Sequence, residues 1–369
     1  GKDFPDKGLT VSLLAEIALD LVKQTVEINN LNINVGEMHL SADISGTQIK
    51  DKPVFKGPIK ISEFDLSKLM KSMAIPLPKM QAVDALSKAS LAFDLDATDN
   101  SAKLQNIDIK VDETIIKGSA SVDNFTQPKI VFNINVDSID VDRYLAPAKK
   151  GSSKPAIVTP ATAAAAGANL LPVETLRAVN ANGELIIERF KINKLNMQGL
   201  SLKLKAKNGL LTTQQQVKQL YQGRYTGNTT INVKNRTPVV ALDERVSDVH
   251  VEPLLKDMQG EAKMSGVVNA NIAVQGYGNS VAAIKSSLNG KLGFDFKNGV
   301  VRGFNLQKII DNTKALIDGA ALPTDNKNDQ TVFSVIKGTA KIKKGLVKND
   351  DLYLEASKLR VKGKGTASL

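Results

Sequence analysis

The sequence of 369 residues contains no cysteine and no tryptophan, only two histidines, and few aromatic side chains. The lack of cysteine excludes disulfides and thiolate metal sites but leaves the compartment open. With His39 and His250 as its only imidazoles, the chain would need carboxylates to complete a zinc site. No stretch reaches eighteen apolar residues in a row, so none predicts a membrane-spanning helix by itself. There is also no signal-peptide pattern.

The usual motifs of catalysis and cofactor binding are missing as well. The sequence has no G-x-S-x-G, no P-loop and no H-E-x-x-H. Gly276-Tyr277-Gly278 lacks the third glycine of a dinucleotide fingerprint, which favours an ordinary turn. Asp94, Asp96 and Asp99 are spaced like part of a calcium loop, but the glycine and the closing Glu are out of place. The sequence therefore predicts no enzyme, no cofactor and no metal site.

The net charge of +11 comes mainly from lysine, because only eight of the 49 basic residues are arginine. Lysine is a solvated point charge and not a bidentate phosphate fork. Lys203, Lys205 and Lys207 alternate with apolar residues, as on the wet side of a strand, where lysine discourages pairing with other sheets. This pattern favours a solvated surface over a nucleic-acid partner, and it leaves anionic lipid headgroups as a secondary interpretation.

Apolar and polar residues alternate along much of the chain, as in strands with one apolar face and one wet face. The segment 260–310 is the clearest case, with an alternating run at 268–274, a short helix expected at 280–288, and a second run at 292–296. Asn298-Gly299 is a strong hairpin signal and predicts a turn there. Residues 9–22 suit either a helix or a strand, and the β pattern that follows favours a strand. The sequence thus predicts a mainly β, elongated, twisted and curled antiparallel sheet with several short helices.

The apolar sides of these runs are the candidate lining of an open groove. The residues predicted to lie there are Leu40, Ile44, Phe93, Leu95, Ile107, Ile109, Ile130, Phe132, Ile134, Leu200, Leu202, Leu204, Val268, Ile272, Val274, Leu292, Phe294 and Phe296.

A second pattern recurs between the strands, in which a strand exit runs directly into a short helix. It occurs at 64–70, 139–145, 249–255 and 304–310, and the last helix is expected to continue to about residue 318. Each copy has an acidic or polar residue near the helix start, which suits N-capping and the helix dipole. Such helices are too short to roof a broad sheet.

Residues 146–169 are rich in Pro, Ala, Ser and Lys and have no hydrophobic period, which predicts a flexible linker. The expected organisation is a first β segment at 1–145 and a second at 170–369.

An apolar face must be covered, because each fully buried aliphatic side chain contributes roughly 1.5–3 kcal/mol. One solution is a second sheet, which gives a sandwich. The other is an apolar ligand lying in a curled sheet that does not close. The alternation by itself favours the sandwich, since a sandwich needs no partner.

Several segments resemble the C-terminal region of the AsmA family of Gram-negative envelope proteins. They are LPVETLR (171–177), NGEL (182–185), NGL (208–210), LYQGRY (220–225), VEPLL (251–255), LNG (288–290) and the run 298–306, with Leu195 and Leu200 between them. DVDRYL (140–145) is similar to another hallmark of that family.

The resemblance implies a periplasmic protein tethered to the inner membrane by an N-terminal helix that is absent from this chain. It also implies an apolar β trough that carries phospholipids or other acyl-chain lipids toward the outer membrane, as in bridge-like lipid-transfer proteins. The competing hypothesis is a scaffold or chaperone for outer-membrane protein assembly that pairs strands with a client. An enzyme acting on envelope polymers has no residue constellation to support it.

Overall fold

A computed structural model of the chain describes residues 10–147, 169–319, 329–356 and 359–369. Strands dominate these residues and the helices among them are short, which confirms the prediction of a mainly β protein. The chain forms two compact units. One comprises Gly1–Ser153, Ala178–Ile192 and Gly199–Asn208, and the other comprises Lys154–Arg177, Asn193–Gln198 and Gly209–Leu369.

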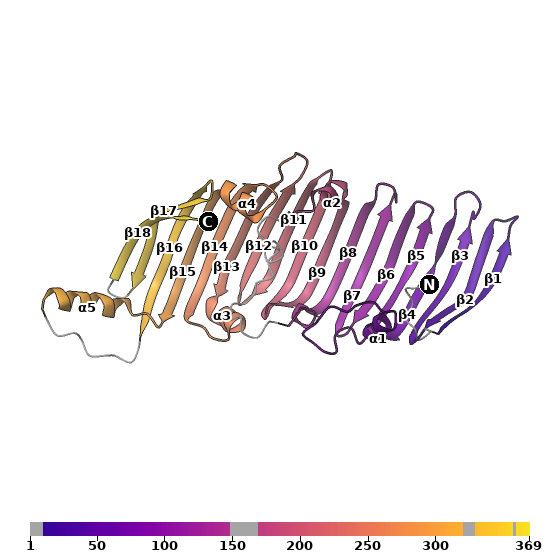
Figure 1. Ribbon diagram of the computed structural model, residues 1–369, viewed down its shortest axis with the longest axis horizontal. Helices are drawn as coiled ribbons and strands as arrows, with labels where there is room; N and C mark the ends of the chain where they lie inside the picture. The colour runs from indigo at the N-terminus through magenta and orange to yellow at the C-terminus, as the bar shows by residue number, and fades with distance from the viewer. Residues whose placement is uncertain (1–9, 148–168, 320–328, 357–358) are drawn as a thin grey trace. The chain divides into compact units, whose positions relative to one another are not determined.

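The first unit is a sheet of strands that lie side by side in chain order (Figure 1). Its strands are β1 (Val11–Asp20), β2 (Thr25–Val35), β3 (Met38–Thr47), β4 (Val54–Phe64), β5 (Ala89–Thr98), β6 (Ser101–Val111), β7 (Thr114–Asp123), β8 (Lys129–Asp140), β9 (Asn180–Ile192) and most of β10 (Leu195–Lys207). Each strand from β1 to β7 pairs antiparallel with the next. Strand β1 confirms the choice of a strand over a helix near the N-terminus.

The pairing of β8 with β9 differs from the antiparallel arrangement predicted throughout. These two strands are parallel, with Phe132 opposite Gly183 and Val136 opposite Ile187. Parallel neighbours need a crossover connection of a dozen or more residues. The chain between Asp140 and Asn180 is long enough to return to the end of the sheet from which β8 started. Strand β9 in turn pairs with β10.

The second unit contains a run of antiparallel strands, each paired with the next. They are β11 (Leu210–Leu220), β12 (Gly223–Asn232), β13 (Val239–His250), β14 (Met264–Tyr277), β15 (Asn289–Arg302), β16 (Gln330–Lys343), β17 (Leu346–Ala356) and β18 (Leu359–Ser368). In both units, therefore, strands that are neighbours in sequence are with few exceptions neighbours in space.

The helices lie at the ends of strands and do not cover a sheet face (Figure 1). They are α1 (Leu66–Ser72), the 3-10 helix η1 (Val141–Arg143), α2 (Val173–Ala178), α3 (Val251–Gln259), α4 (Val281–Ser287) and α5 (Leu306–Ile317). The helices predicted at 280–288 and from Phe304 onward are confirmed by α4 and α5.

The recurring strand-to-helix unit is present at all four predicted positions. Asp65, Asp140 and Asn305 accept hydrogen bonds at helix N-termini from the backbone N–H groups of Lys68 (2.9 Å), Asp142 (3.1 Å) and Lys308 (3.0 Å). His250 precedes α3 without a side-chain cap bond. Three of the four units therefore use the predicted capping chemistry.

Four strands contain a register shift at an Asn or Asp in the left-handed region. These residues are Asn30, Asn106, Asp248 and Asn298, with φ between 48° and 56°. Asn and Asp tolerate this conformation better than other residues with a Cβ. Each bulge adds one residue to its strand. As a result, Ile28 and Leu31 lie on the same face although they are three residues apart. Their partners on β3 are Ile44 and Ala42, which are two residues apart.

The predicted hairpin turn at Asn298-Gly299 is wrong, because β15 runs straight through it. Asn298 forms a bulge, and Gly299 lies opposite Phe333 on β16. A Cβ on Gly299 would meet the Phe333 ring at 2.0 Å, so the glycine is needed for the close approach of that ring. The same dipeptide that favours a turn therefore serves here to admit an aromatic side chain.

The predicted linker at 146–169 lies almost entirely outside the described residues. It and the division of the chain at 145 and 170 therefore stay predictions. The compact units group β9 and most of β10, which follow this segment in sequence, with β1 to β8.

Candidate functional site

One face of the first unit is apolar from strand to strand. Residues opposite one another in a ladder project to the same side. Leu40 lies opposite Ile61, Ile59 opposite Phe93, and Gly118 opposite Ile134. The register places on this face the predicted residues Leu40, Ile44, Phe93, Leu95, Ile107, Ile109, Ile130, Phe132 and Ile134. We call it the apolar face and the opposite side the polar face.

Strand β10 extends the apolar face of the first unit. On β9, Glu184 lies opposite Asn133, which is on the polar face of β8. The Glu184 Oε1 atom accepts a hydrogen bond from Ser201 (3.3 Å) and lies 3.9 Å from the Lys203 Nζ. Ser201 and Lys203 are therefore on the polar face. By alternation, the predicted residues Leu200, Leu202 and Leu204 are on the apolar face.

The second unit has an apolar face of its own. The remaining predicted residues all lie on it, with Val268 opposite Phe296, Ile272 opposite Leu292, and Val274 and Phe294 in the same ladder of β14 and β15. None of the eighteen predicted residues is exposed. Ile107, Val274 and Phe296 are buried, and the others are half-buried. The predicted residues thus form one face in each unit, while their role as the lining of a groove stays a prediction.

The largest fully buried side chain among the described residues is that of Phe333, on the second apolar face. Its side chain is only 2% exposed, and its ring lies 5.0 Å from that of Phe296 in an edge-to-face arrangement. Edge-to-face pairs add about 0.5–1.5 kcal/mol beyond the area that they bury. This contact joins β15 to β16 on that face.

The apolar face of β11, β12 and β13 also carries a group of polar residues that the sequence pattern did not identify. We call Thr213, Gln215, Tyr225, Thr229 and Glu244 the polar cluster. Ladder partners place all five on this face, since Thr213 lies opposite Thr229, Gln215 and Glu244 both lie opposite Gly227, and Tyr225 lies opposite Val246. These polar residues interrupt the apolar alternation, which is why β11 and β12 gave no strand signal. No local pattern in the sequence assigns these five residues to the apolar face.

Glu244 is at the centre of the polar cluster. Its Oε2 atom accepts a hydrogen bond from the Tyr225 hydroxyl (2.5 Å), and its Oε1 atom accepts a longer one from Thr229 (3.4 Å). Burial and the bond to Glu244 both raise the pKa of Tyr225 well above its usual value. A Cβ on Gly227 would lie 1.7 Å from the Glu244 Oε2, so the glycine makes room for this pair.

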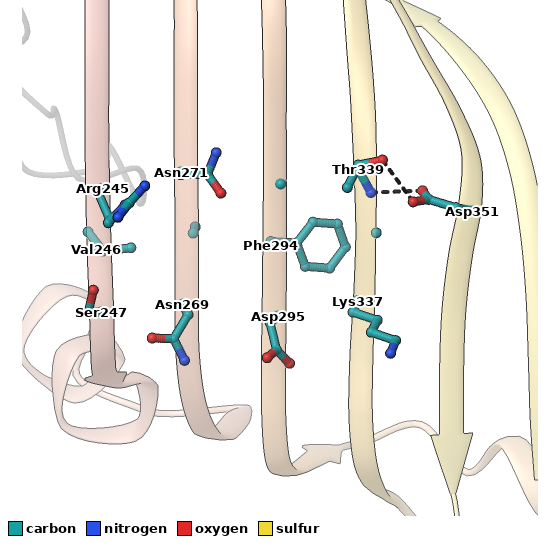
Figure 2. Close-up of a pocket in the computed structure, with 13 residues that line it drawn as sticks. Arg245, Val246, Ser247, Asn269, Asn271, Phe294, Asp295, Lys337, Thr339 and Asp351 are labelled. Atoms are coloured by element: carbon teal, nitrogen blue, oxygen red, sulfur yellow. Dashed lines mark hydrogen bonds between the residues drawn. The ribbon is translucent and has the colours of Figure 1, made fainter.

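The polar face of the second unit contains an open hollow of about 600 Å³ between β13 and β17 (Figure 2). It is bordered by two rows of side chains, Arg245, Asn271 and Thr339 in one row and Asn269, Asp295 and Lys337 in the next. Gly293 leaves a gap in the first row. Hydrogen bonds from the Thr339 backbone N–H (2.8 Å) and hydroxyl (2.7 Å) lower the pKa of Asp351 at one end. The hollow is bordered by both positive and negative side chains, which do not suit an acyl chain.

Phe294 also borders this hollow, although its ladder partners Ala270 and Gly338 belong to the apolar face. Within the part of the chain that the structure describes, no three His, Asp or Glu side chains group to hold a metal ion. No helix among the same residues has the length and hydrophobicity needed to cross a membrane.

Comparison with known proteins gives one match. The model of the AsmA family matches residues 14–352, which is most of the chain and includes all eighteen predicted lining residues. No curated protein and no solved structure matches. The segments that resemble this family, from DVDRYL at 140–145 to the run at 298–306, all lie inside the matched range. The chain therefore belongs to the AsmA family.

Proposed function

We propose that this chain binds the acyl chains of phospholipids on its apolar faces and carries them between the inner and outer membranes of a Gram-negative bacterium. Membership in the AsmA family indicates a role in the cell envelope, in lipid transfer or assembly, and the family is not known as enzymatic. The observation that carries the finer proposal is the continuity of apolar side chains from strand to strand across β1 to β9, with none of the described helices lying over them.

The free energy for binding comes from the remaining exposure of these side chains. Most of the predicted lining residues are half-buried, so each still presents apolar surface to water. Covering such surface contributes about 25 cal/mol per Å². Dispersion contacts are individually weak and not directional, and a lipid held only by many of them can slide from one row to the next. Transfer by this route needs no catalytic residue.

The location follows from the same proposal. A carrier of this kind works in the periplasm and is held at the inner membrane by a hydrophobic anchor. Outer-membrane or other envelope proteins are its expected partners at the far end. The lysines on the polar face, such as Lys203 at 60% exposure, keep that side wet while the acyl chains occupy the other.

Native mass spectrometry of the purified chain tests the proposal. We expect additional species shifted by masses in the phospholipid range, and these shifts should disappear after delipidation with organic solvent. A chain that carries no added mass when purified without detergent would contradict the proposal. Bound client peptide in place of lipid would instead select a scaffold role.

A scaffold that pairs strands with a client is the second candidate, and strand β1 is the feature that favours it. Leu13, Ile17 and Leu19 are each more than half exposed on this strand, at 69%, 67% and 57%. Exposed apolar strands readily accept another strand. In the lipid proposal, these exposed side chains belong to the first strand of the apolar face, because Leu13 lies opposite Ile33 and Leu19 opposite Val26.

A further inference from the structure

The polar cluster contains a charge that the rest of its face does not. Among the described residues that the ladders place on the apolar face of β11 to β18, Glu244 is the only one with a charged side chain. Its neighbours across the sheet are Gly227 on one side and Ile272 on the other. A carboxylate in such surroundings loses hydration and needs a partner.

The hydrogen bonds within the cluster leave acceptors in excess. Gln215 donates from Nε2 to the hydroxyls of Thr213 (2.6 Å) and Thr229 (3.0 Å), and Thr229 and Tyr225 donate to Glu244. A carboxylate can accept about four hydrogen bonds. Glu244 accepts two within the described residues, and one of these is long. The Gln215 Oε1 atom is buried and has no partner in the same part of the chain. The cluster can therefore take further donors, and the Thr213 hydroxyl is its only donor without an acceptor among the described residues.

No basic residue of the described chain compensates the carboxylate. Glu244 takes part in none of the ion pairs between described residues. Arg245 follows it directly in sequence but projects from the polar face, where it borders the hollow in Figure 2. The described residues thus provide no positive charge next to Glu244 on this face, and a bound molecule can supply it.

We infer that the polar cluster is a headgroup station that binds the primary ammonium group of a zwitterionic phospholipid, with Glu244 as its counter-ion. The inference rests on the proposed function, since the lipid must lie on this face. A primary ammonium supplies both the missing charge and three N–H donors, which match the spare acceptors of Glu244. A quaternary ammonium has no N–H to donate, and an anionic glycerol headgroup would meet the carboxylate with like charge. The station therefore discriminates among headgroups while the flanking aliphatic rows hold the tails.

The test compares the lipids that the full chain takes up from vesicles containing equal amounts of phosphatidylethanolamine and phosphatidylglycerol. Bound lipid is extracted and the two classes are measured by mass spectrometry. We expect the wild-type chain to be enriched in phosphatidylethanolamine. The change Glu244→Gln keeps the shape and the acceptor for Tyr225 but removes the charge, and it should lower the ratio about fivefold, because a charge-assisted bond is roughly twice as strong as a neutral one.

Asp243→Asn is the matched control, since it removes the same charge from the adjacent residue on the exposed polar face. It should leave the ratio unchanged. Circular dichroism and thermal melting establish that all three chains are folded equally. An unchanged ratio in Glu244→Gln, or an equal change in both variants, would overturn the headgroup station while leaving lipid binding intact. The absence of lipid from every chain would overturn the proposed function and the station together.

Discussion

Replacing Phe294 with Asp should remove most of the lipid that purifies with this chain. Phe294 lies in the middle of the second apolar face, in one row with Ala270 and Gly338, whose small side chains leave its ring as the main apolar surface there. A carboxylate at this position would have to lose hydration against an acyl chain, at a cost of several kcal/mol. We expect at least about a tenfold loss of bound lipid, since 1.4 kcal/mol already corresponds to a factor of ten. Lipid extraction followed by mass spectrometry gives the measurement.

Neighbouring residues on β14 supply the controls for sidedness. Ile272→Asp places a charge on the same apolar face and should have the same effect, whereas Asn271→Lys places one on the exposed polar face and should have little. The yield of folded protein has to be compared among the three variants, because a charge on a packed face also destabilises the fold. Equal lipid recovery from all three folded variants would show that the face of the sheet does not matter.

Truncating Phe333 to alanine should cause the largest loss of stability of any substitution considered for the second unit. The side chain is 2% exposed and packs against the Phe296 ring, while Gly299 provides the space beneath it. Phe→Ala changes at buried sites cost about 3–5 kcal/mol, because apolar contacts are lost and a cavity remains. Hydrogen exchange resolved to β16 should show a decrease of that size in the free energy of opening.

Val332 is the control for this change. It is the preceding residue on β16, 56% exposed on the opposite face, and Val332→Ala should alter the opening free energy of the strand by no more than about 0.5 kcal/mol. If Phe333→Ala costs no more than Val332→Ala, the two faces of this sheet are packed alike. In that case the distinction between an apolar and a polar face would fail.

Where apolar and polar residues alternate strictly, the sequence alone predicted the face on which each side chain lies. Ile272 and Phe294 belong to uninterrupted period-2 runs, and both lie on the side that the pattern assigns to them. Sidedness is predictable because successive side chains on a strand point in opposite directions. Short helices such as α4 and α5 were predictable for a similar reason, since a capping residue, Ser280 or Asn305, precedes the apolar repeat.

The bulges were not predicted from the alternation, although each has a recognisable pattern in the sequence. Each has two apolar or small residues three apart with Asn or Asp at the third position, as in Leu104-Gln105-Asn106-Ile107 and Val246-Ser247-Asp248-Val249. A search for strict alternation of apolar and polar residues interprets this three-residue spacing as the end of a strand or as a turn. The Asn-Gly pair at 298–299 is the same device, and the hairpin predicted there was wrong for that reason.

Two further features depend on contacts between distant segments. The parallel pairing of β8 with β9 is decided by where the chain returns after Asp140, and no local pattern encodes it. The polar cluster forms only because Glu244 and Tyr225 meet across β12 and β13. Each looks like an ordinary surface residue in the sequence, and only the ladder shows that both lie on the apolar side.

Photo-crosslinking at adjacent residues of β8 tests most directly whether lipid occupies the apolar face. Phe132 is on that face opposite Ala120, while Asn133 is exposed on the polar face opposite Ser119. Each is replaced in turn by p-benzoylphenylalanine, and the chain is irradiated in the presence of phospholipid vesicles. The account predicts lipid adducts at position 132 and none above background at position 133. Adducts at both positions in equal amounts, or at neither, would contradict it.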